Sequence, residues 1–219
     1  MKIRKIVLIA AFTMVAAMSY AQTTFGVRAG VNFQNINGKD ESGEKLTNDM
    51  IVGFNAGVNA EIPVAPDFYF QPGLLFSTKG AKESVEGYTT QINLSYVELP
   101  LHLVYKPLLG KGHLILGFGP YVAYGVTGKV KMDIGGTETE YDVKFKNKVT
   151  SSDDDDVFYT KGLDAGADLF AGYEFPFKVS VQLNTQLGLL NLEPDYEGDS
   201  GDKAVVKNTG FGISVGYRF

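Results

Sequence analysis

The sequence predicts an all-β protein: an eight-stranded antiparallel up-and-down transmembrane β-barrel that follows an N-terminal signal peptide. Three observations lead to this prediction. Eight segments alternate between apolar and small or polar side chains, the connections between them alternate in length, and the chain opens with a basic and then an apolar stretch. A membrane barrel needs such alternation in every strand, because lipid touches one face of the strand and the lumen touches the other.

The first 21 residues have the three parts of a secretory signal peptide. Basic residues open the chain, an apolar stretch covers residues 6–17, and Ser19-Tyr20-Ala21 offers a small-x-small cleavage site. The apolar stretch is too short for a comfortable membrane span, which argues against an uncleaved anchor. We therefore expect residues 1–21 to be removed and residues 22–219 to form the barrel domain, which takes the formal net charge from −5 to −8.

The eight predicted strands follow in order along the mature chain. They cover residues 25–34, 53–62, 68–77, 97–105, 113–127, 163–175, 179–189 and 208–219. The first three alternate without interruption. Before the fourth, Ile92 and Leu94 are out of phase with the rest of the strand, so we expect a β-bulge near Ser95. Within the fourth, Pro100 removes a ladder hydrogen bond and predicts a further local irregularity.

The last four strands are defined by what lies opposite their apolar side chains. The fifth has glycine and tyrosine there, the sixth has glycine and acidic residues, and the seventh has serine and amides. The eighth has small residues and Arg218 opposite a row that ends in Tyr217 and Phe219. Small residues relieve crowding inside a narrow barrel. We expect Tyr217 and Phe219 to form the C-terminal signal that the barrel-assembly machinery reads.

The connections alternate in length, as in outer-membrane barrels. The short ones are residues 63–67, 106–112 and 176–177, and the longer, polar ones are residues 37–50, 79–89, 129–160 and 192–206. Short turns are expected on the periplasmic side and long loops outside. Residues 129–149 could be counted as further strand around a Gly135-Gly136 turn. However, residues 137–140 are polar on both faces, which lipid would not tolerate, so we expect a hairpin above the membrane.

Composition excludes several classes of function. The chain has no cysteine, which rules out disulfides, zinc–thiolate sites and a cysteine nucleophile. It is acidic and has no basic stripe, which argues against nucleic acid. Beyond the signal peptide, no run of apolar residues approaches the length of a transmembrane helix. The two histidines have no obvious third ligand, so we expect no metal and no other cofactor.

Three segments carry a resemblance to a known family. They are residues 95–106, with a Tyr-φ-Glu-φ-Pro-φ pattern, residues 25–32 and residues 216–219. Together they make the mature chain resemble the Bacteroidetes outer-membrane β-barrel family, described as porin-like or PorT-like. The resemblance implies a barrel domain in the outer membrane of the cell envelope. It implies no catalytic residues, because such families host many roles on one fold.

Eight ionisable side chains are predicted to face the lumen. They are Arg28, Glu61, Glu98, His102, Asp164, Asp168, Glu174 and Arg218. Charges inside a narrow barrel are poorly hydrated and need partners, so we expect a salt-bridge network that fills the lumen. The alternative is a narrow polar pathway or a small-ligand cavity. Arg28 and Arg218 are expected to meet near the periplasmic end, because the first and last strands of a closed barrel are neighbours.

A run of four acidic residues, Asp153, Asp154, Asp155 and Asp156, lies in the longest predicted outer loop. A site for calcium, or for a cation that bridges lipopolysaccharide, is one interpretation. The run lacks the spaced ligands and turn glycine of a calcium loop. We expect instead a solvated, mobile acidic loop. Together with residues 192–206 it would attract divalent or basic partners weakly and in a salt-dependent way.

The sequence predicts a location and a class of role. We expect a non-enzymatic outer-membrane barrel with a structural or surface-interaction role, whose loops at residues 129–160 and 192–206 contact an extracellular or envelope protein. Its other expected partners are outer-membrane lipid and the assembly machinery. The alternatives are a narrow porin-like channel for small solutes, an accessory factor in secretion or envelope assembly, and a lipid-modifying enzyme, for which no nucleophile–base pair is evident. A soluble lipocalin-like barrel, with its two faces reversed, is the alternative fold.

Overall fold

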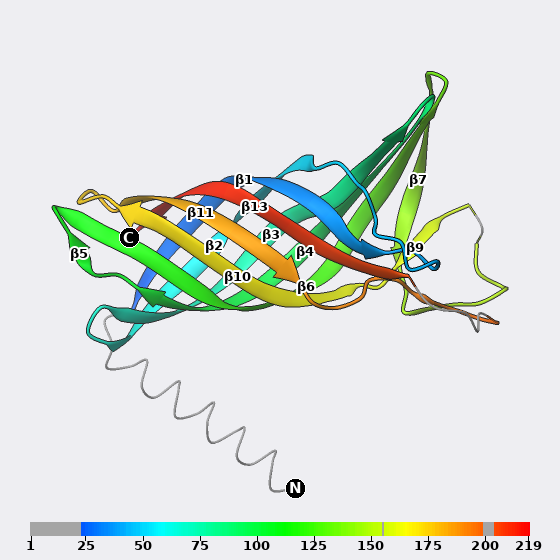
Figure 1. Ribbon diagram of the computed structural model, residues 1–219. Helices are drawn as coiled ribbons and strands as arrows, with labels where there is room; N and C mark the ends of the chain where they lie inside the picture. Colours follow the sequence, from blue (N-terminus) through cyan, green and yellow to red (C-terminus); the bar gives the residue numbers. More distant parts are fainter. Residues whose placement is uncertain (1–22, 155, 199–203) are drawn as a thin grey trace, which may run out of the picture.

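The computed structural model describes residues 23–154, 156–198 and 204–219, so the predicted signal peptide lies outside the described residues. Within them, eight long strands form one antiparallel ring (Figure 1). In ring order they are β1 (Thr24–Lys39), β2 (Ile51–Ala65), β3 (Phe68–Val85), β4 (Tyr88–Tyr105), β6 (Gly112–Ile134), β10 (Leu163–Glu174), β11 (Val179–Gly188) and β13 (Val205–Arg218). β13 pairs with β1 and closes the barrel, which confirms the predicted fold class.

The two faces of the barrel wall have opposite chemistry. Asn32, Asn55 and Ser77 are buried on the inner face, whereas Phe54 and Leu99 on the outer face are 52% and 48% exposed. Polar inside and apolar outside is the arrangement that lipid requires, and it is the reverse of a lipocalin. The soluble alternative is therefore wrong. No helix in the described part of the chain is long and apolar enough to cross a membrane.

The two ends of the barrel differ in the length of their connections. The C-terminus and the start of β1 lie at the end that carries the short turns, which we call the short-turn end (Figure 1). β5 (Leu108–Leu109) is at this end and pairs with the start of β6. We call the opposite end the long-loop end. In an outer-membrane barrel, short turns face the periplasm and long loops face outward.

The loop predicted at residues 79–89 is wrong. β3 continues to Val85 and β4 begins at Tyr88, so only Glu86 and Gly87 form the turn. Gly87 has a φ of 75°, a left-handed conformation that glycine adopts without strain. The segment resembles a loop in sequence because strand ends that stand outside lipid can carry polar side chains on both faces.

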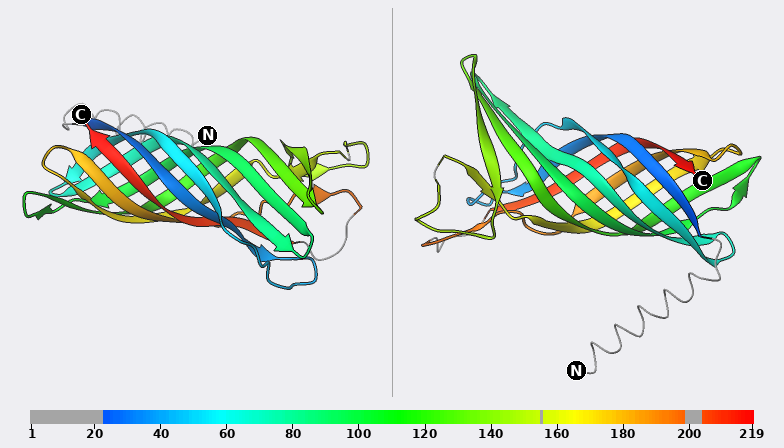
Figure 2. Two further views of the ribbon diagram at one scale, coloured as in Figure 1. Left: turned by 90° about the horizontal axis from the view of Figure 1, so that it is seen from above. Right: turned by 180° about the vertical axis from the view of Figure 1, so that it is seen from behind.

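A second hairpin extends beyond the barrel beside the first. β6 reaches Ile134, Gly135 and Gly136 form the turn with φ values of 60° and 87°, and β7 (Thr137–Phe145) returns antiparallel to β6. This is the hairpin that the sequence predicts within residues 129–149. The Gly135 N–H donates to the Gly87 carbonyl over 3.1 Å, which joins the two hairpin tips. We call β7 and the outer ends of β3, β4 and β6 the projecting sheet (Figures 1 and 2).

Short strands organise the rest of the long-loop end. β9 (Phe158–Thr160) pairs in parallel with β7, and β12 (Asp195–Tyr196) pairs in parallel with β8 (Lys148–Val149). The segments between the ring strands therefore pack on one another and on the projecting sheet. The long-loop end has a defined surface where the sequence predicts loops.

The irregularity predicted near Ser95 is present, but for a different reason. The register between β4 and β6 shifts between Ser95 and Tyr96, where the extra residue is Val126 of β6. Leu94 is buried on the same side of β4 as Tyr96 and does not turn toward lipid. The apolar residues before Ser95 thus belong to a core inside the barrel. The register is the same on both sides of Pro100, but the β3–β4 ladder has no pairs between Gly73–Leu74 and Leu99–Pro100, so the predicted irregularity is a gap and not a shift.

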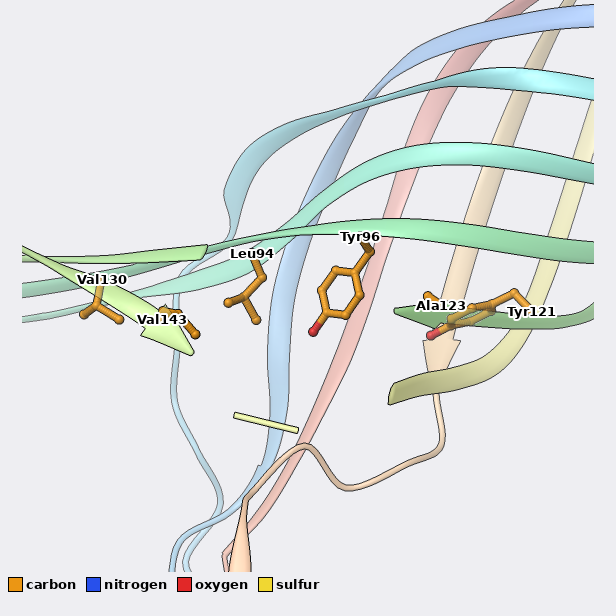
Figure 3. Packing of buried hydrophobic residues seen from close by; sticks show 6 residues of the cluster. All are labelled: Leu94, Tyr96, Tyr121, Ala123, Val130 and Val143. Carbon is orange, nitrogen blue, oxygen red and sulfur yellow. The ribbon is translucent and has the colours of Figure 1, made fainter. Parts of the chain in front are cut away.

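That core lies in the long-loop half of the barrel and in the projecting sheet (Figure 3). Its buried members are Leu94, Tyr96, Tyr121, Ala123, Val130 and Val143. They run from Val130 and Val143, in the projecting sheet, through Leu94 to Tyr96 and Tyr121 in the lumen (Figure 3). A smaller cluster of Val104, Ile115 and Phe170 lies nearer the short-turn end.

Candidate functional site

Charged side chains cross the lumen at successive levels. Nearest the long-loop end, Lys79 of β3 lies between Glu98 of β4 and Asp164 of β10. Its Nζ is 2.8 Å from Glu98 Oε2 and 3.0 Å from Asp164 Oδ2. The side chains of Lys79 and Asp164 are fully buried. The lumen hydrates these charges poorly, so each one needs a partner of opposite sign. The Lys79 ammonium, between the two carboxylates, provides that partner for both.

Aromatic and amide side chains complete this level. The Tyr121 hydroxyl and the Asn208 amide donate to Asp164 Oδ2 over 3.2 and 3.0 Å. The rings of Tyr96 and Tyr121 lie 5.1 and 4.4 Å from Lys79 Nζ, within the range of a cation–π interaction. We call this group, together with Glu98, the Lys79 level. It packs charge, hydrogen bonds and rings across the lumen.

A second group closes the short-turn end. Lys106 Nζ is 3.0 Å from Glu61 Oε2 and 2.8 Å from Glu174 Oε2. Arg218 adds a second cation, with its Nη2 2.9 Å from Glu61 Oε1 and its Nη1 donating to Asn59 over 2.7 Å. We call these residues the Lys106 level. Here too, each charge has a partner of opposite sign.

A histidine–carboxylate pair lies between the two levels. His102 Nε2 is 2.9 Å from Asp168 Oδ2. The Gln186 amide donates to Asp168 over 3.0 Å and to Glu98 over 3.1 Å, which links the pair to the Lys79 level. The His102 ring also packs on Phe170, with centroids 4.9 Å apart. The structure therefore brings Glu98, His102 and Asp168 into one hydrogen-bonded chain.

Arg28 differs from the other lumen cations. In the described part of the chain it makes no ion pair, and its buried Nε has no hydrogen-bond partner. It lines a small cavity with Glu98 and Asp168, whose carboxylates supply compensating charge. Its ladder partner is Gly216, two residues before Arg218, so the two arginines are diagonal neighbours and not partners.

Little space remains among these side chains. The cavity beside Arg28 and Gln186 has a volume of about 30 Å³. That is roughly the share of liquid volume that one water molecule occupies. The middle of the lumen is thus filled by side chains.

Neither lysine belongs to the predicted lumen set, because Lys79 falls in a predicted loop and Lys106 in a predicted turn. The predicted set held two cations, Arg28 and Arg218, against five carboxylates. Among the described residues the lumen has four cations against the same five carboxylates, beside His102. That imbalance was a usable signal, since buried carboxylates need cationic partners. The two-residue period of a strand was a second usable signal, because Lys79 follows the inward-facing Ser77 by two positions.

Tyr217 and Phe219 face away from the lumen at the short-turn end. They are 44% and 63% exposed, and their rings meet edge to face at 5.3 Å. This position suits an aromatic girdle at the membrane interface. Their role as an assembly signal stays a prediction.

At the long-loop end, Asp153 holds a turn together. Both of its carboxylate oxygens lie 2.5 Å from Lys146 Nζ, and Oδ2 accepts the Thr150 backbone N–H over 2.7 Å. Asp153 therefore has defined partners within the loop, whereas the mobility of the acidic run stays a prediction. Lys146 stands seven positions earlier and was not among the predicted site residues.

The acidic residues that follow Asp153 also make contacts within the loop. Asp154 Oδ2 is 3.3 Å from Lys144 Nζ, and its Oδ1 accepts the Asp156 backbone N–H over 3.1 Å. Asp155 lies outside the described residues. Among the residues that the structure describes, no group of three or more His, Asp or Glu side chains is arranged to hold a metal ion.

We expect Asp153 to titrate well below an ordinary aspartate. The Lys146 ammonium, and next the Thr150 N–H, lower the pKa of the Asp153 carboxyl to about 2. Because this pKa is depressed on folding, the turn keeps its stabilisation above the unfolded value near 3.8 and loses it as the pH falls toward about 2. A carbon-13 NMR titration of the carboxyl measures this pKa.

Two variants make that titration decisive. Lys146→Met should move the pKa of Asp153 up toward the ordinary value, whereas Asp156→Asn should leave it in place. An Asp153 that titrates near 3.8 in the unmodified protein would contradict the turn seen here.

Sequence comparison agrees with this architecture. The sequence profile of the outer membrane protein beta-barrel domain matches residues 20–193. The chain belongs to that family. The match covers most of the ring and places the protein in the outer membrane. No curated protein sequence matches the chain.

Three solved structures of outer-membrane proteins are similar to this barrel. Ail, the attachment invasion locus protein of Yersinia pestis, is 14% identical, with 90% of this chain and 98% of that chain covered and a TM-score of 0.38. Neisserial surface protein A is 12% identical, with 89% and 97% covered and a TM-score of 0.43. A major outer membrane protein of Thermus thermophilus is 14% identical, with 90% and 100% covered and a TM-score of 0.43.

Proposed function

We propose that this protein is a non-enzymatic barrel that acts through its long-loop end and that its lumen is closed to solutes. The observation that carries the proposal is the filled lumen. The Lys79 level and the Lys106 level cross it at two heights, and the cavity between them holds about 30 Å³. Eight-stranded barrels have interiors just wide enough for side chains, and this one uses them for ion pairs. Such a network rigidifies a platform and disfavours the channel alternative.

The long-loop end supports a role in surface interaction. The projecting sheet is held by a hydrogen bond between its two hairpin tips, and short strands fix the adjoining segments. A rigid surface binds a partner at a lower entropic cost than a mobile loop does. The resemblance of residues 95–106 to the Bacteroidetes outer-membrane β-barrel family, described as porin-like or PorT-like, supports a partner within the envelope or just outside it.

The surroundings of His102 support a non-enzymatic role. His102 is 2% exposed and sits between Asp168 and Phe170. In the described residues no serine or threonine hydroxyl hydrogen-bonds its ring. A nucleophile within hydrogen-bond reach of the base, and open to substrate, is the minimum for acyl transfer. The His102–Asp168 pair is better explained as part of the lumen network.

We expect the refolded mature protein to show no discrete openings in a planar bilayer, because ion pairs cross the lumen at both levels and rings add to the Lys79 level. A heat-dependent gel shift first verifies that the sample is a folded barrel. A general porin added to the same bilayer serves as the positive control. Reproducible single-channel steps from the verified barrel would overturn the closed-lumen proposal.

Site-specific photo-crosslinking in intact cells tests the surface role without knowledge of the partner. A photoreactive amino acid at Glu138, on the exposed tip of the projecting sheet, should give discrete protein adducts. The same residue at the lipid-facing Phe118, which is 59% exposed, is the matched control and should give none. Identical patterns from the two positions would contradict a specific surface at the long-loop end.

A further inference from the structure

A second cavity lies at the long-loop end, apart from the lumen network, and has a volume of about 380 Å³. Its apolar wall comes from five ring or hairpin strands and one connection. The buried wall residues are Ile36, Ala81, Leu94, Val130, Val143 and Leu192. This size and lining are those of small-molecule sites, which range over roughly 300–1,000 Å³. We call this cavity the mouth pocket.

The mouth pocket is blind on its lumen side. Leu94, Val130 and Val143 belong both to its wall and to the apolar core (Figure 3). The next members of that core, Tyr96 and Tyr121, lie over the Lys79 ammonium. A molecule that enters from outside therefore meets a closed floor. The geometry is that of a binding cup and not of an entrance to a pore.

The wall is fixed before any ligand arrives. The Leu192 N–H donates to the Val206 carbonyl over 2.8 Å, and the Leu192 carbonyl accepts the Lys161 N–H over 2.8 Å and the Thr160 hydroxyl over 3.0 Å. These bonds join the connection after β11 to β13 and to β9. A site that is already ordered loses little entropy when a ligand binds.

The polar groups of the mouth pocket select for positive charge. Glu83 and Glu193 line it, and among the described residues no lysine or arginine does. Burial, followed by the nearby Glu41, raises the pKa of Glu193 although Lys161 opposes the shift, so the carboxyl gains from a cationic neighbour. Three aromatic residues, whose faces attract cations, also line the pocket. They are Phe158, Tyr159 and Tyr196.

We propose that the mouth pocket binds a compact apolar molecule that carries one amine. The apolar body would occupy the buried wall, and the ammonium would lie against Glu193 and the aromatic rim. The inference goes beyond the proposed surface role, because it needs no protein partner. A barrel that gives no crosslinked partner could still bind such a ligand.

Three matched probes test the proposal: 1-adamantylamine, 1-adamantanol and adamantane-1-carboxylate. Each is titrated by calorimetry into the refolded mature protein in micelles. We expect saturable binding of the amine. The alcohol should bind more weakly, and the carboxylate should bind most weakly. An ammonium–carboxylate hydrogen bond contributes more to binding than a neutral hydrogen bond does. Glu193→Gln should therefore lower the affinity for the amine by at least about tenfold. The same substitution should leave the affinity for the alcohol nearly unchanged.

Two filled variants and one charge control separate binding in the pocket from partition into detergent. Ala81→Phe fills the wall and should abolish binding of all three probes, and Thr90→Phe provides a second filled variant should the first fail the gel-shift test of folding. Glu86→Gln, at the exposed hairpin turn, is the matched charge control and should bind as the unmodified protein does. Equal binding to the filled variants, or a carboxylate that binds as tightly as the amine, would overturn the proposal.

Discussion

Lys79→Met should destabilise the barrel by about 3–5 kcal/mol, the usual cost of removing one partner from a buried ion pair. The substitution keeps most of the side-chain volume but leaves Glu98 and Asp164 without their shared cation. Both carboxylates are at most 6% exposed, so water cannot replace the ammonium. The midpoint of urea unfolding, followed by circular dichroism on refolded protein, measures the loss.

Two further variants distinguish the effect of leaving buried charges without a partner from the effect of losing any lysine charge. Lys129→Met removes an exposed partner of Glu140 and should change the midpoint little, because surface ion pairs contribute weakly. Adding Asp164→Asn to Lys79→Met should recover part of the stability, because it removes one uncompensated charge. If Lys79→Met and Lys129→Met were equally mild, the Lys79 level would not be a stabilising element.

The eight strands are predictable from sequence because each strand meets lipid on one side and side chains on the other. That constraint acts residue by residue, so the pattern is visible within each segment alone. It stops where the strands leave the membrane. Residues 83–87, at the tip of the β3–β4 hairpin, are exposed on both faces, and their polar sequence therefore resembles a loop.

The pairing of lumen charges is predictable only in part. That Glu98 and Asp164 face inward follows from their own strands. That Lys79 joins them depends on the stagger of the closed ring, because Lys79 and Asp164 are 85 positions apart. The register sets Glu98 and Asp164 on either side of Ala123 in one row around the barrel. No local pattern encodes that stagger.

Phe170 is an exception to the expectation that inner-face side chains are small or polar, because it is a large apolar side chain on the inner face of β10. It is 3% exposed and packs on Val104, Ile115 and the His102 ring. Phe170 is absent from the predicted inward set, since its side chain is neither polar nor small. The opposing residue explains its place: Gly117 pairs with Phe170, and a Cβ there would overlap the ring.

The glycine and the ring should therefore be strongly coupled. Phe170→Ala should cost about 3–5 kcal/mol, because it empties a packed site that the rigid wall cannot close. Gly117→Ala alone should cost about 1–3 kcal/mol, because the ring must move. In the Phe170→Ala background the same methyl enters vacated space, so its cost should vanish or reverse. Urea midpoints of the four proteins give the coupling free energy.

The lipid-facing Phe118→Ala is the control, since it removes a ring of the same size from the outer face of β6. Its side chain is exposed on the face of the wall opposite the buried Phe170 ring, so its cost should add to that of Gly117→Ala without coupling. Strict additivity of Phe170→Ala and Gly117→Ala would mean that the lumen relaxes freely around the ring. That result would weaken the closed-lumen proposal as well, because a wall soft enough to absorb the methyl could also open a path past the Lys79 level.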